Sequence, residues 1–176
     1  FKSVTVLSWD ICRNHFSKAY NMAECLSKDF DVQLIGFRFF EERIFPPYER
    51  EQPNFETLYF EGDQFPAFGS SLSKALAAIR GEIIYAVKPR LPSFGLALLS
   101  NYHFGKPFVL EINDLESVVS NPGKSYSDKE IRLEDVDFSD EKFLNPYSDP
   151  WSMVMEKFAS EAPVLVTHNN NINSYF

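Results

Sequence analysis

Short apolar runs alternate with amphipathic segments along most of this chain. The apolar runs predict strands at Val4–Trp9, Val32–Phe37, Ile83–Val87, Phe108–Ile112 and Val164–Thr167. They are continuously apolar rather than alternating, which is typical of strands covered on both faces. A further strand is predicted around Leu58–Glu61.

Helical periodicity occupies the intervals between these runs. Apolar residues recur at helical spacing in Ser17–Lys28, Ser70–Arg80, Ser93–His103 and, more weakly, Trp151–Ala159. We predict N-caps at Ser17 and Ser93, and helix ends at Gly81 and Gly105. Strands and helices joined by short connections predict an α/β, doubly wound fold with a mostly parallel sheet.

Two segments, 39–66 and 115–149, interrupt this rhythm. The second is predicted to be a long acidic loop, because residues 114–149 hold ten acidic and four basic residues, a net charge of −6 (4 − 10). Loops of this length are uncommon in compact domains and are usually functional or mobile. We therefore expect this loop to be functional or mobile.

The composition limits the kinds of protein to which this chain can belong. The chain has 176 residues, 44% hydrophobic, which predicts one packed domain over residues 1–176. Its net charge of −8 makes nucleic acid an unlikely partner, since phosphate binding needs clustered Lys and Arg. Cys12 and Cys25 are far apart and predict reduced thiols in a cytoplasmic protein. Scattered histidines predict no metal site, and no apolar run is long enough to span a bilayer.

Polar residues follow the predicted strands. In an open parallel sheet these positions share one edge, and ligands bind there, where the strand order reverses. The candidates are Asp10, Arg13, Asn14 and His15 after the first strand, Lys88, Arg90 and Ser93 after the third long one, Asn113, Asp114 and Glu116 after the fourth, and His168 and Asn169 after the last. Singly, each also fits a solvated loop or a helix cap. Their clustering on one edge favours a site.

The connector Tyr85–Gly95, "YAVKPRLPSFG", is the most unusual of these loops. Its prolines restrict the backbone and are expected to hold the preceding residues, Lys88 and Leu91, in an extended conformation. Two cations on such a stiff loop lose less entropy on binding an anion than two on a flexible one. Lys88 and Arg90 are therefore predicted to face an anionic group.

Several enzyme classes are disfavoured by missing motifs. No two of the seven glycines are spaced as Gly-x-Gly, so the dinucleotide-binding fingerprint is absent. The chain also has no P-loop and no Gly-x-Ser-x-Gly nucleophile elbow. These absences name no function.

A resemblance to a known protein family does suggest a function. The run "IIYAVKPRLPSFGLALLSNYHFGKPFVLEINDLE", residues 83–116, resembles the middle of the N-terminal Rossmann-like domain of GT-B glycosyltransferases, in particular the retaining family 4 (group 1) enzymes. Gly105-Lys106-Pro107 and Asn113-Asp114-Leu115-Glu116 match that layout. The opening strand–helix–strand and the closing "APVLVTHNNNINSYF" are similar to the same domain, so that about half of the chain is covered.

The resemblance implies a three-layer Rossmann-like fold and an acceptor-binding role. Asp114 would be catalytic, and the loop after the first strand would lie near the donor. The acceptor would contact Lys88, Arg90, Ser93, Asn113, Glu116, His168 and Asn169. A nucleotide-sugar donor would be bound mainly by a second domain absent from this chain, and the reaction would need no metal or other cofactor. The acceptor would be a glycan, a lipid-linked sugar or a small molecule.

The chain departs from the family at two places. The glycine pair common in the first loop is replaced by Arg13-Asn14-His15, and the frequent His-Asp is Asn113-Asp114. Two other readings stay open: a non-enzymatic flavodoxin-like binding or response module, and a GT-B-type sugar-nucleotide epimerase. A peripheral contact with the inner membrane face is a further alternative. It would use Phe37, Phe39, Phe40 and Phe45 with Arg38 and Arg43.

Overall fold

A computed structural model describes residues 1–40, 43–116, 132–168 and 172 of the protein. Six strands form one sheet in the order β3-β2-β1-β4-β5-β6, and all five neighbouring pairs are parallel. The strands are β1 (Ser3–Leu7), β2 (Asp31–Arg38), β3 (Glu56–Glu61), β4 (Ile83–Val87), β5 (Phe108–Ile112) and β6 (Val164–Thr167). The predicted α/β class is confirmed, and the order is that of Rossmann-like folds.

Four helices connect the strands in the described residues. They are α1 (Phe16–Leu26), α2 (Ala67–Ala78), α3 (Leu96–Phe104) and α5 (Asp149–Lys157). Each overlaps one of the four predicted helical segments. A short π-helical turn, η2 (Leu91–Gly95), precedes α3, and a 3-10 turn, η6 (Phe158–Glu161), joins α5 to β6.

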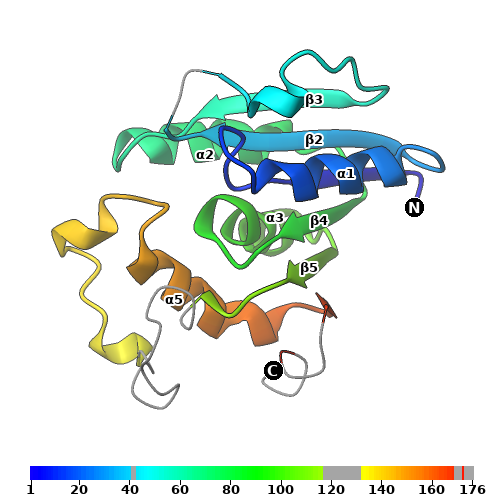
Figure 1. Cartoon of the computed structure of the whole chain (residues 1–176). Coiled ribbons are helices and arrows are strands. Elements are labelled where there is room, and N and C mark those ends of the chain that lie inside the picture. Colours follow the sequence, from blue (N-terminus) through cyan, green and yellow to red (C-terminus); the bar gives the residue numbers. More distant parts are fainter. Residues whose placement is uncertain (41–42, 117–131, 169–171, 173–176) are drawn as a thin grey trace.

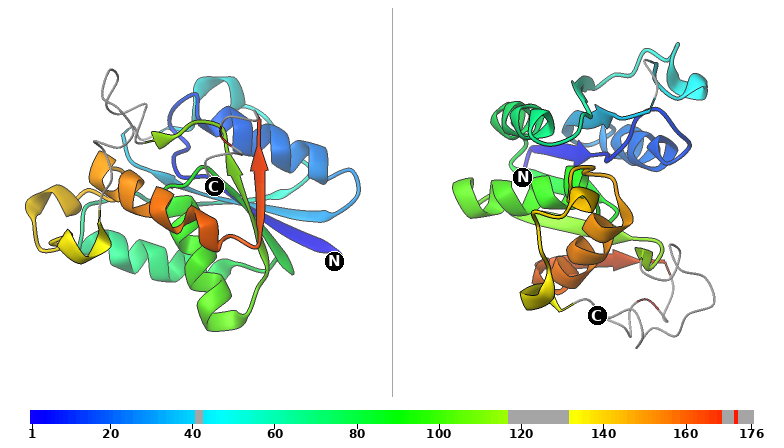
Figure 2. Two further views of the ribbon diagram at one scale, coloured as in Figure 1. Left: turned by 90° about the horizontal axis from the view of Figure 1, so that it is seen from below. Right: turned by 90° about the vertical axis from the view of Figure 1, so that its left-hand side faces the viewer.

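The helices form a layer on each face of the sheet (Figures 1 and 2). Successive residues of a strand point to opposite faces. Val4 and Val6 of β1 therefore pack with α1, whereas Leu7 packs in the larger core with α2, α3 and α5. The sheet is buried on both sides near its centre, which explains why its strands read as continuous apolar runs.

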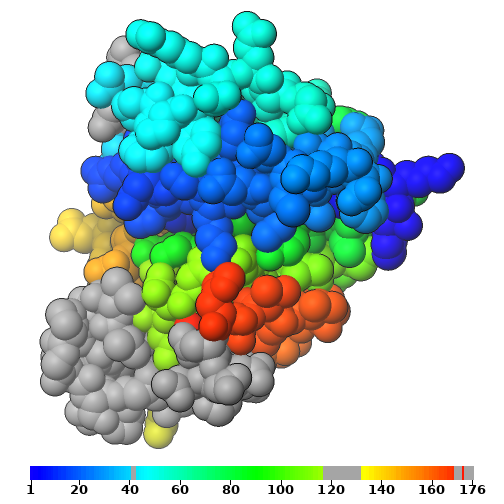
Figure 3. All heavy atoms as spheres, turned by 45° about the vertical axis from the view of Figure 1, so that its right-hand side comes forward, coloured from blue at the N-terminus to red at the C-terminus, as the bar shows by residue number. Residues whose placement is uncertain are grey.

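The α1 side of the sheet is covered unevenly. Beyond α1, β6 comes to the surface (Figure 3), and Val164 at its start is 50% exposed. Among the residues described, no helix is both long and apolar enough to cross a membrane.

Two of the predicted helix boundaries are wrong at their N-termini. Helix α1 begins at Phe16 with His15 at the N-cap position, so Ser17 lies inside the helix. Ser93 lies within the turn η2, where its hydroxyl donates to the carbonyl of Lys88 at 2.9 Å. Serine hydroxyls can bond a nearby carbonyl as readily as cap a helix, and periodicity does not distinguish the two.

Of the two helix ends that we predicted at glycines, one is confirmed and the other is wrong. Gly105 closes α3 in the left-handed conformation, with φ of 66°, as predicted. Helix α2 instead ends at Ala78, before Gly81. Gly81 is needed for a close approach, because a Cβ there would lie 2.3 Å from the backbone nitrogen of Thr5.

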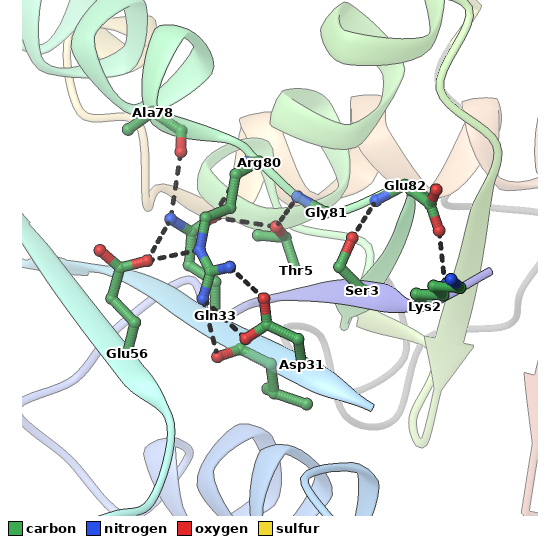
Figure 4. A network of polar contacts seen from close by, with 11 residues as sticks. Lys2, Ser3, Thr5, Asp31, Gln33, Glu56, Ala78, Arg80, Gly81 and Glu82 are labelled. Carbon is green, nitrogen blue, oxygen red and sulfur yellow. Dashed lines mark hydrogen bonds and ion pairs between the residues drawn. The ribbon is translucent and has the colours of Figure 1, made fainter. Parts of the chain in front are cut away.

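A polar network holds Gly81 at the amino ends of the strands (Figure 4). The Gly81 backbone N–H donates to the buried Thr5 hydroxyl at 2.9 Å, and that hydroxyl donates to Gln33 at 2.9 Å. Arg80 donates to Glu56 at 2.7 Å, and the same glutamate oxygen accepts from Gln33 at 2.9 Å. The buried polar groups of this network are therefore satisfied by one another.

The connector after β4 is tighter than its prolines suggest. Lys88 has φ of 69°, in the left-handed region, and Leu91 is part of the π-helical turn. The prediction that both residues are extended is therefore wrong. The Lys88 carbonyl accepts from the Arg90 N–H at 2.8 Å and from the Ser93 hydroxyl. Such a conformation costs about 1–3 kcal/mol in a non-glycine residue and is concentrated at functional sites.

The predicted acidic loop is described only at its ends, since residues 117–131 lie outside the described residues. The part from 132 to 148 contains the 3-10 turns Leu133–Asp135 and Glu141–Phe143. Phe143 is buried, and its carbonyl accepts from the Trp151 indole N–H at 2.8 Å. This stretch therefore packs against the start of α5.

Candidate functional site

The strand order reverses at the carboxyl ends of β1 and β4. These strands are neighbours, but the chain leaves β1 towards β2 and leaves β4 towards β5, on the opposite side. The connections therefore diverge, and the loops after β1 and β4 border the place where ligands bind in this architecture. The two loops bring together Trp9 and His15 from one side and Lys88 and Arg90 from the other.

Arg90 is held inside the protein. Its side chain is 13% exposed. The guanidinium pairs with the Glu116 carboxylate, contacts the Ser152 hydroxyl, and donates to the Tyr147 carbonyl at 3.4 Å. Its Cζ lies 5.2 Å from the centre of the Trp9 ring. These contacts join the β4 loop to the β1 loop and to α5, which makes Arg90 a positioning residue in this conformation.

Lys88 bridges two carboxylates at the rim. Its Nζ lies 3.2 Å from Oδ2 of Asp114 and 3.3 Å from Oε1 of Glu116. The Glu116 side chain is 1% exposed, whereas that of Asp114 is 52% exposed. The two cations predicted to face an anion are thus already paired within the protein. Asp114 is the outermost charged group of this cluster, and an external anion site at Lys88 and Arg90 stays a prediction.

His15 completes the cluster from the β1 side. Its ring centre lies 5.1 Å from that of Trp9. Partial burial of the imidazole lowers the pKa of His15, and the nearby charges of Lys88 and Arg90 lower it further. Glu116 opposes this effect more weakly. The neutral imidazole is therefore the favoured form near neutral pH, able to donate and to accept one hydrogen bond.

The titration of His15 provides a first test. We expect NMR to give a pKa for His15 below its ordinary 6.5, and we expect Lys88→Met to raise it. Because the folded-state pKa is lower than the unfolded one, this group lowers the stability of the fold as the pH falls below about 6.5. His15→Gln should remove that loss. An unchanged His15 titration in the Lys88 variant would contradict the proximity of the two charges.

The other residues of the first loop have different roles. Asp10 is buried, and its Oδ1 accepts from the Cys12 backbone N–H at 3.0 Å, which shapes the loop. Arg13 is exposed and stacks over the Phe40 ring, with its Cζ 3.7 Å from the ring centre. Asn14 is also exposed. His15 is in electrostatic contact with Lys88 and Arg90.

The phenylalanines considered for membrane contact are packed within the protein. Phe37 is fully buried, and the ring centre of Phe39 lies 5.7 Å from that of Phe68 in α2. Phe40 lies 4.7 Å from the Tyr147 ring centre. Phe45 belongs to the partly buried residues around the α1 core. Peripheral membrane contact stays a prediction, and these residues present no large exposed apolar group for it.

A second cluster lies beside the first and contains residues that the sequence did not single out. Glu111, near the end of β5, is 1% exposed and pairs with Lys18 of α1 at 2.8 Å and with His168 at 2.6 Å. Lys18 also donates to Oδ1 of Asn113 at 2.7 Å. The signal for Glu111 was present, since a glutamate inside the apolar strand "FVLEI" must be paired when buried.

Tyr85 of β4 lies next to the same carboxylate. Burial raises the pKa of Tyr85, and the charge of Glu111 together with a hydrogen bond to it raises it further. The tyrosine therefore stays protonated at physiological pH and acts as a neutral polar neighbour of Glu111.

The predicted site residues thus fall into groups. His15, Lys88, Arg90, Asp114 and Glu116 form one cluster, while Asn113 and His168 belong to the second, around Glu111. Ser93 bonds the backbone of the connector, and Asn169 lies outside the described residues. Within the described ranges no group of three or more His, Cys, Asp or Glu residues could hold a metal ion.

No protein-family model matches this sequence, and no curated protein matches it either.

Proposed function

We propose that this chain is the acceptor-binding domain of a glycosyltransferase, an enzyme that transfers a sugar from a nucleotide-sugar donor to an acceptor hydroxyl. The observation that carries the proposal is the charged rim at the strand-order reversal. There Asp114, Lys88 and His15 offer a carboxylate, an ammonium and an imidazole beside the Trp9 ring. Such groups bind the hydroxyls of a sugar, and the buried Trp9 ring supports them from inside the protein.

Asp114 is the group best placed to bind a substrate hydroxyl. Its carboxylate is half-exposed, and Lys88 fixes its orientation from behind. Lys88 is in turn fixed by Glu116 and by the strained turn of the connector. A preordered acceptor of hydrogen bonds lowers the barrier by orienting the acceptor hydroxyl against the donor.

The donor would be bound mainly by a second domain. The loop after β1 carries Arg13-Asn14-His15 in place of the glycine pair, so side chains lie where glycines would allow a diphosphate to approach the backbone closely. In the proposed enzyme the first loop closes the donor side of the cleft, and no metal or other cofactor takes part.

The strand order bears on the principal alternative. Flavodoxin-like proteins have the order 2-1-3-4-5. In this protein β1 lies between β2 and β4, and β3 is at the edge. The order therefore argues against the flavodoxin-like topology of a non-enzymatic response module. A GT-B-type sugar-nucleotide epimerase has the same architecture, so only the reaction product distinguishes it from a glycosyltransferase.

The test is an assay of the full-length protein with a panel of labelled nucleotide sugars and saccharide acceptors. We expect a labelled glycoside product, and we expect Asp114→Asn to lower kcat/KM by about 10-fold to 100-fold, the loss of one hydrogen bond to a charged group. Asp29→Asn, an exposed acid at the opposite end of the strands, is the matched control and should leave kcat/KM unchanged. Release of an epimerised nucleotide sugar without transfer would favour the epimerase.

A further inference from the structure

We propose that a groove between α1 and the segment before β3 binds a small organic cation, a primary alkylammonium. The groove is formed by the C-terminal part of α1 and residues 51–55, whereas His15 and the charged rim are at the other end of this helix. Figure 3 shows the segment before β3 lying along α1 on this face of the molecule. The proposal is independent of the function proposed for the rim.

The groove is a cavity of about 340 Å³. One wall comes from α1 and the turn after it, and the other comes from the segment before β3. The lining residues that matter here are Tyr20, Glu24 and Lys28 on the first wall and Glu51, Pro53 and Phe55 on the second. A volume of this size is at the lower end of the range for small-molecule sites.

Two hydrogen bonds hold the walls together. The Ser27 hydroxyl donates to Oδ1 of Asn54 at 3.0 Å, and the Tyr48 hydroxyl donates to Oδ1 of Asn21 at 3.1 Å. Both bonds join α1 or the turn after it to the segment before β3. The groove is therefore formed by the fold itself, so a ligand does not have to bring its walls together.

Tyr20 is the residue that points to a ligand. It is 6% exposed, and its ring centre lies 4.3 Å from that of Tyr48 and 5.4 Å from that of Phe55. Its hydroxyl has no hydrogen-bond partner among the described residues. Burial raises the pKa of Tyr20, and the charges of Glu51 and Glu24 raise it further, which places both carboxylates near the hydroxyl. A buried polar group of this kind needs a partner from outside the protein.

The charges of the lining favour a cation. Glu24 and Glu51 contribute two negative charges and Lys28 one positive charge, a net charge of −1 (1 − 2). Neither glutamate forms an ion pair with another residue in the described part of the chain. The two carboxylates belong to opposite walls, so a cation between them is attracted by both. A ligand with a single positive charge neutralises the site.

A primary ammonium has the hydrogen-bonding groups that this site lacks. It carries three donors and no acceptor, which match the carboxylates of Glu24 and Glu51 and the oxygen of the Tyr20 hydroxyl. Pro53 and Phe55 provide apolar surface for an alkyl chain attached to the nitrogen. A metal ion is a poorer match, because the described residues contain no group of three or more His, Cys, Asp or Glu that could hold one.

Binding is tested on this chain by NMR titration with n-pentylamine, which is protonated at neutral pH. The uncharged probe of the same length is 1-pentanol. We expect the amine to shift the amide signals of residues 20–28 and 51–55 with a Kd in the millimolar range, since both carboxylates are exposed. Added salt should weaken the binding. Equal shifts with the two probes, or no shift of these residues with the amine, would overturn the proposal.

Charge variants should change the Kd in opposite directions. Glu24→Gln and Glu51→Gln are each expected to weaken amine binding by about threefold to fivefold, and Lys28→Gln to strengthen it by about twofold to fivefold. Glu49→Gln is the matched control, because Glu49 is an exposed acid of the same segment that does not line the cavity. Changes in the same direction at Lys28 and Glu51 would contradict an electrostatic site.

Tyr20→Phe tests the hydroxyl by itself. The variant keeps the ring that packs against Tyr48 and Phe55 and is expected to weaken amine binding by about threefold to tenfold, the loss of one hydrogen bond. An unchanged Kd would refute the role of Tyr20 and, with it, the proposal. Thermal unfolding shows whether each variant is folded. The charge variants are at exposed positions, so their result decides the proposal even if Tyr20→Phe is unstable.

Discussion

Arg90→Met is expected to lower the free energy of unfolding by about 3 kcal/mol, which urea denaturation would measure. The substitution keeps much of the apolar volume beside Trp9 but removes the guanidinium that pairs with Glu116. The glutamate side chain is 1% exposed, so its charge would stay buried with Lys88 as its remaining ion-pair partner among the described residues. Breaking a buried pair from one side leaves such a charge poorly compensated.

A matched variant separates burial from charge. Arg80→Met removes an arginine that also pairs with acids, Asp31 and Glu56, but whose side chain is 41% exposed (Figure 4). Exposed pairs contribute about 0–1 kcal/mol, so this variant should be much closer to the wild type. Equal losses of unfolding free energy in the two variants would show that burial of Arg90 does not increase the cost of removing its charge.

The double variant Arg90→Met with Glu116→Gln completes the cycle. Removing both charges leaves a neutral amide in place of a buried carboxylate, so the double variant should be more stable than Arg90→Met alone. We expect a coupling of about 1–3 kcal/mol between the two positions. Strict additivity would contradict a direct interaction.

Gly81→Ala is expected to have the second large effect, a loss of about 3 kcal/mol. The added Cβ would lie 2.3 Å from the Thr5 nitrogen and 2.7 Å from its hydroxyl oxygen. The neighbours are the backbone and a short side chain of β1, which cannot move without shifting the strand. The hydrogen bond from Gly81 to the Thr5 hydroxyl would also be strained.

Gly69→Ala is the natural control for this loss. Gly69 lies in α2, and a Cβ there would have no neighbour within 4 Å. Alanine is favoured over glycine in a helix by about 0.5–1 kcal/mol, so this variant should be slightly more stable than the wild type. A similar loss in both variants would mean that the effect at position 81 does not come from the close approach to Thr5.

Local sequence patterns were sufficient for most of the fold. The bounds of β4, β5 and β6 agree with the predicted runs, although Glu111 lies inside β5 and β6 is only partly buried. Two helix boundaries failed for different reasons. Ser93 bonds a carbonyl of the preceding loop instead of capping α3, and Gly81 serves a contact with a strand far away in sequence.

The candidate site was predicted less completely. The rule that polar residues after parallel strands share an edge placed Lys88, Asp114 and Glu116 together correctly. It did not find Glu111 or Lys18, because one lies inside a strand and the other inside a helix. Nor did it show that Arg90 is directed inward, since the direction of a long side chain depends on all the elements that surround it.

By itself, the sequence determined which segments are strands and helices and which edge of the sheet carries the charged residues, because periodicity and chain order are local properties. Only the tertiary structure decided how those charges combine. It pairs Arg90 with Glu116 and Lys88 with Asp114, and it brings Lys18, Glu111 and His168 into one hydrogen-bonded group. The physical reason is that a buried charge needs a partner, and which partner is near is set by the packing of elements distant in sequence.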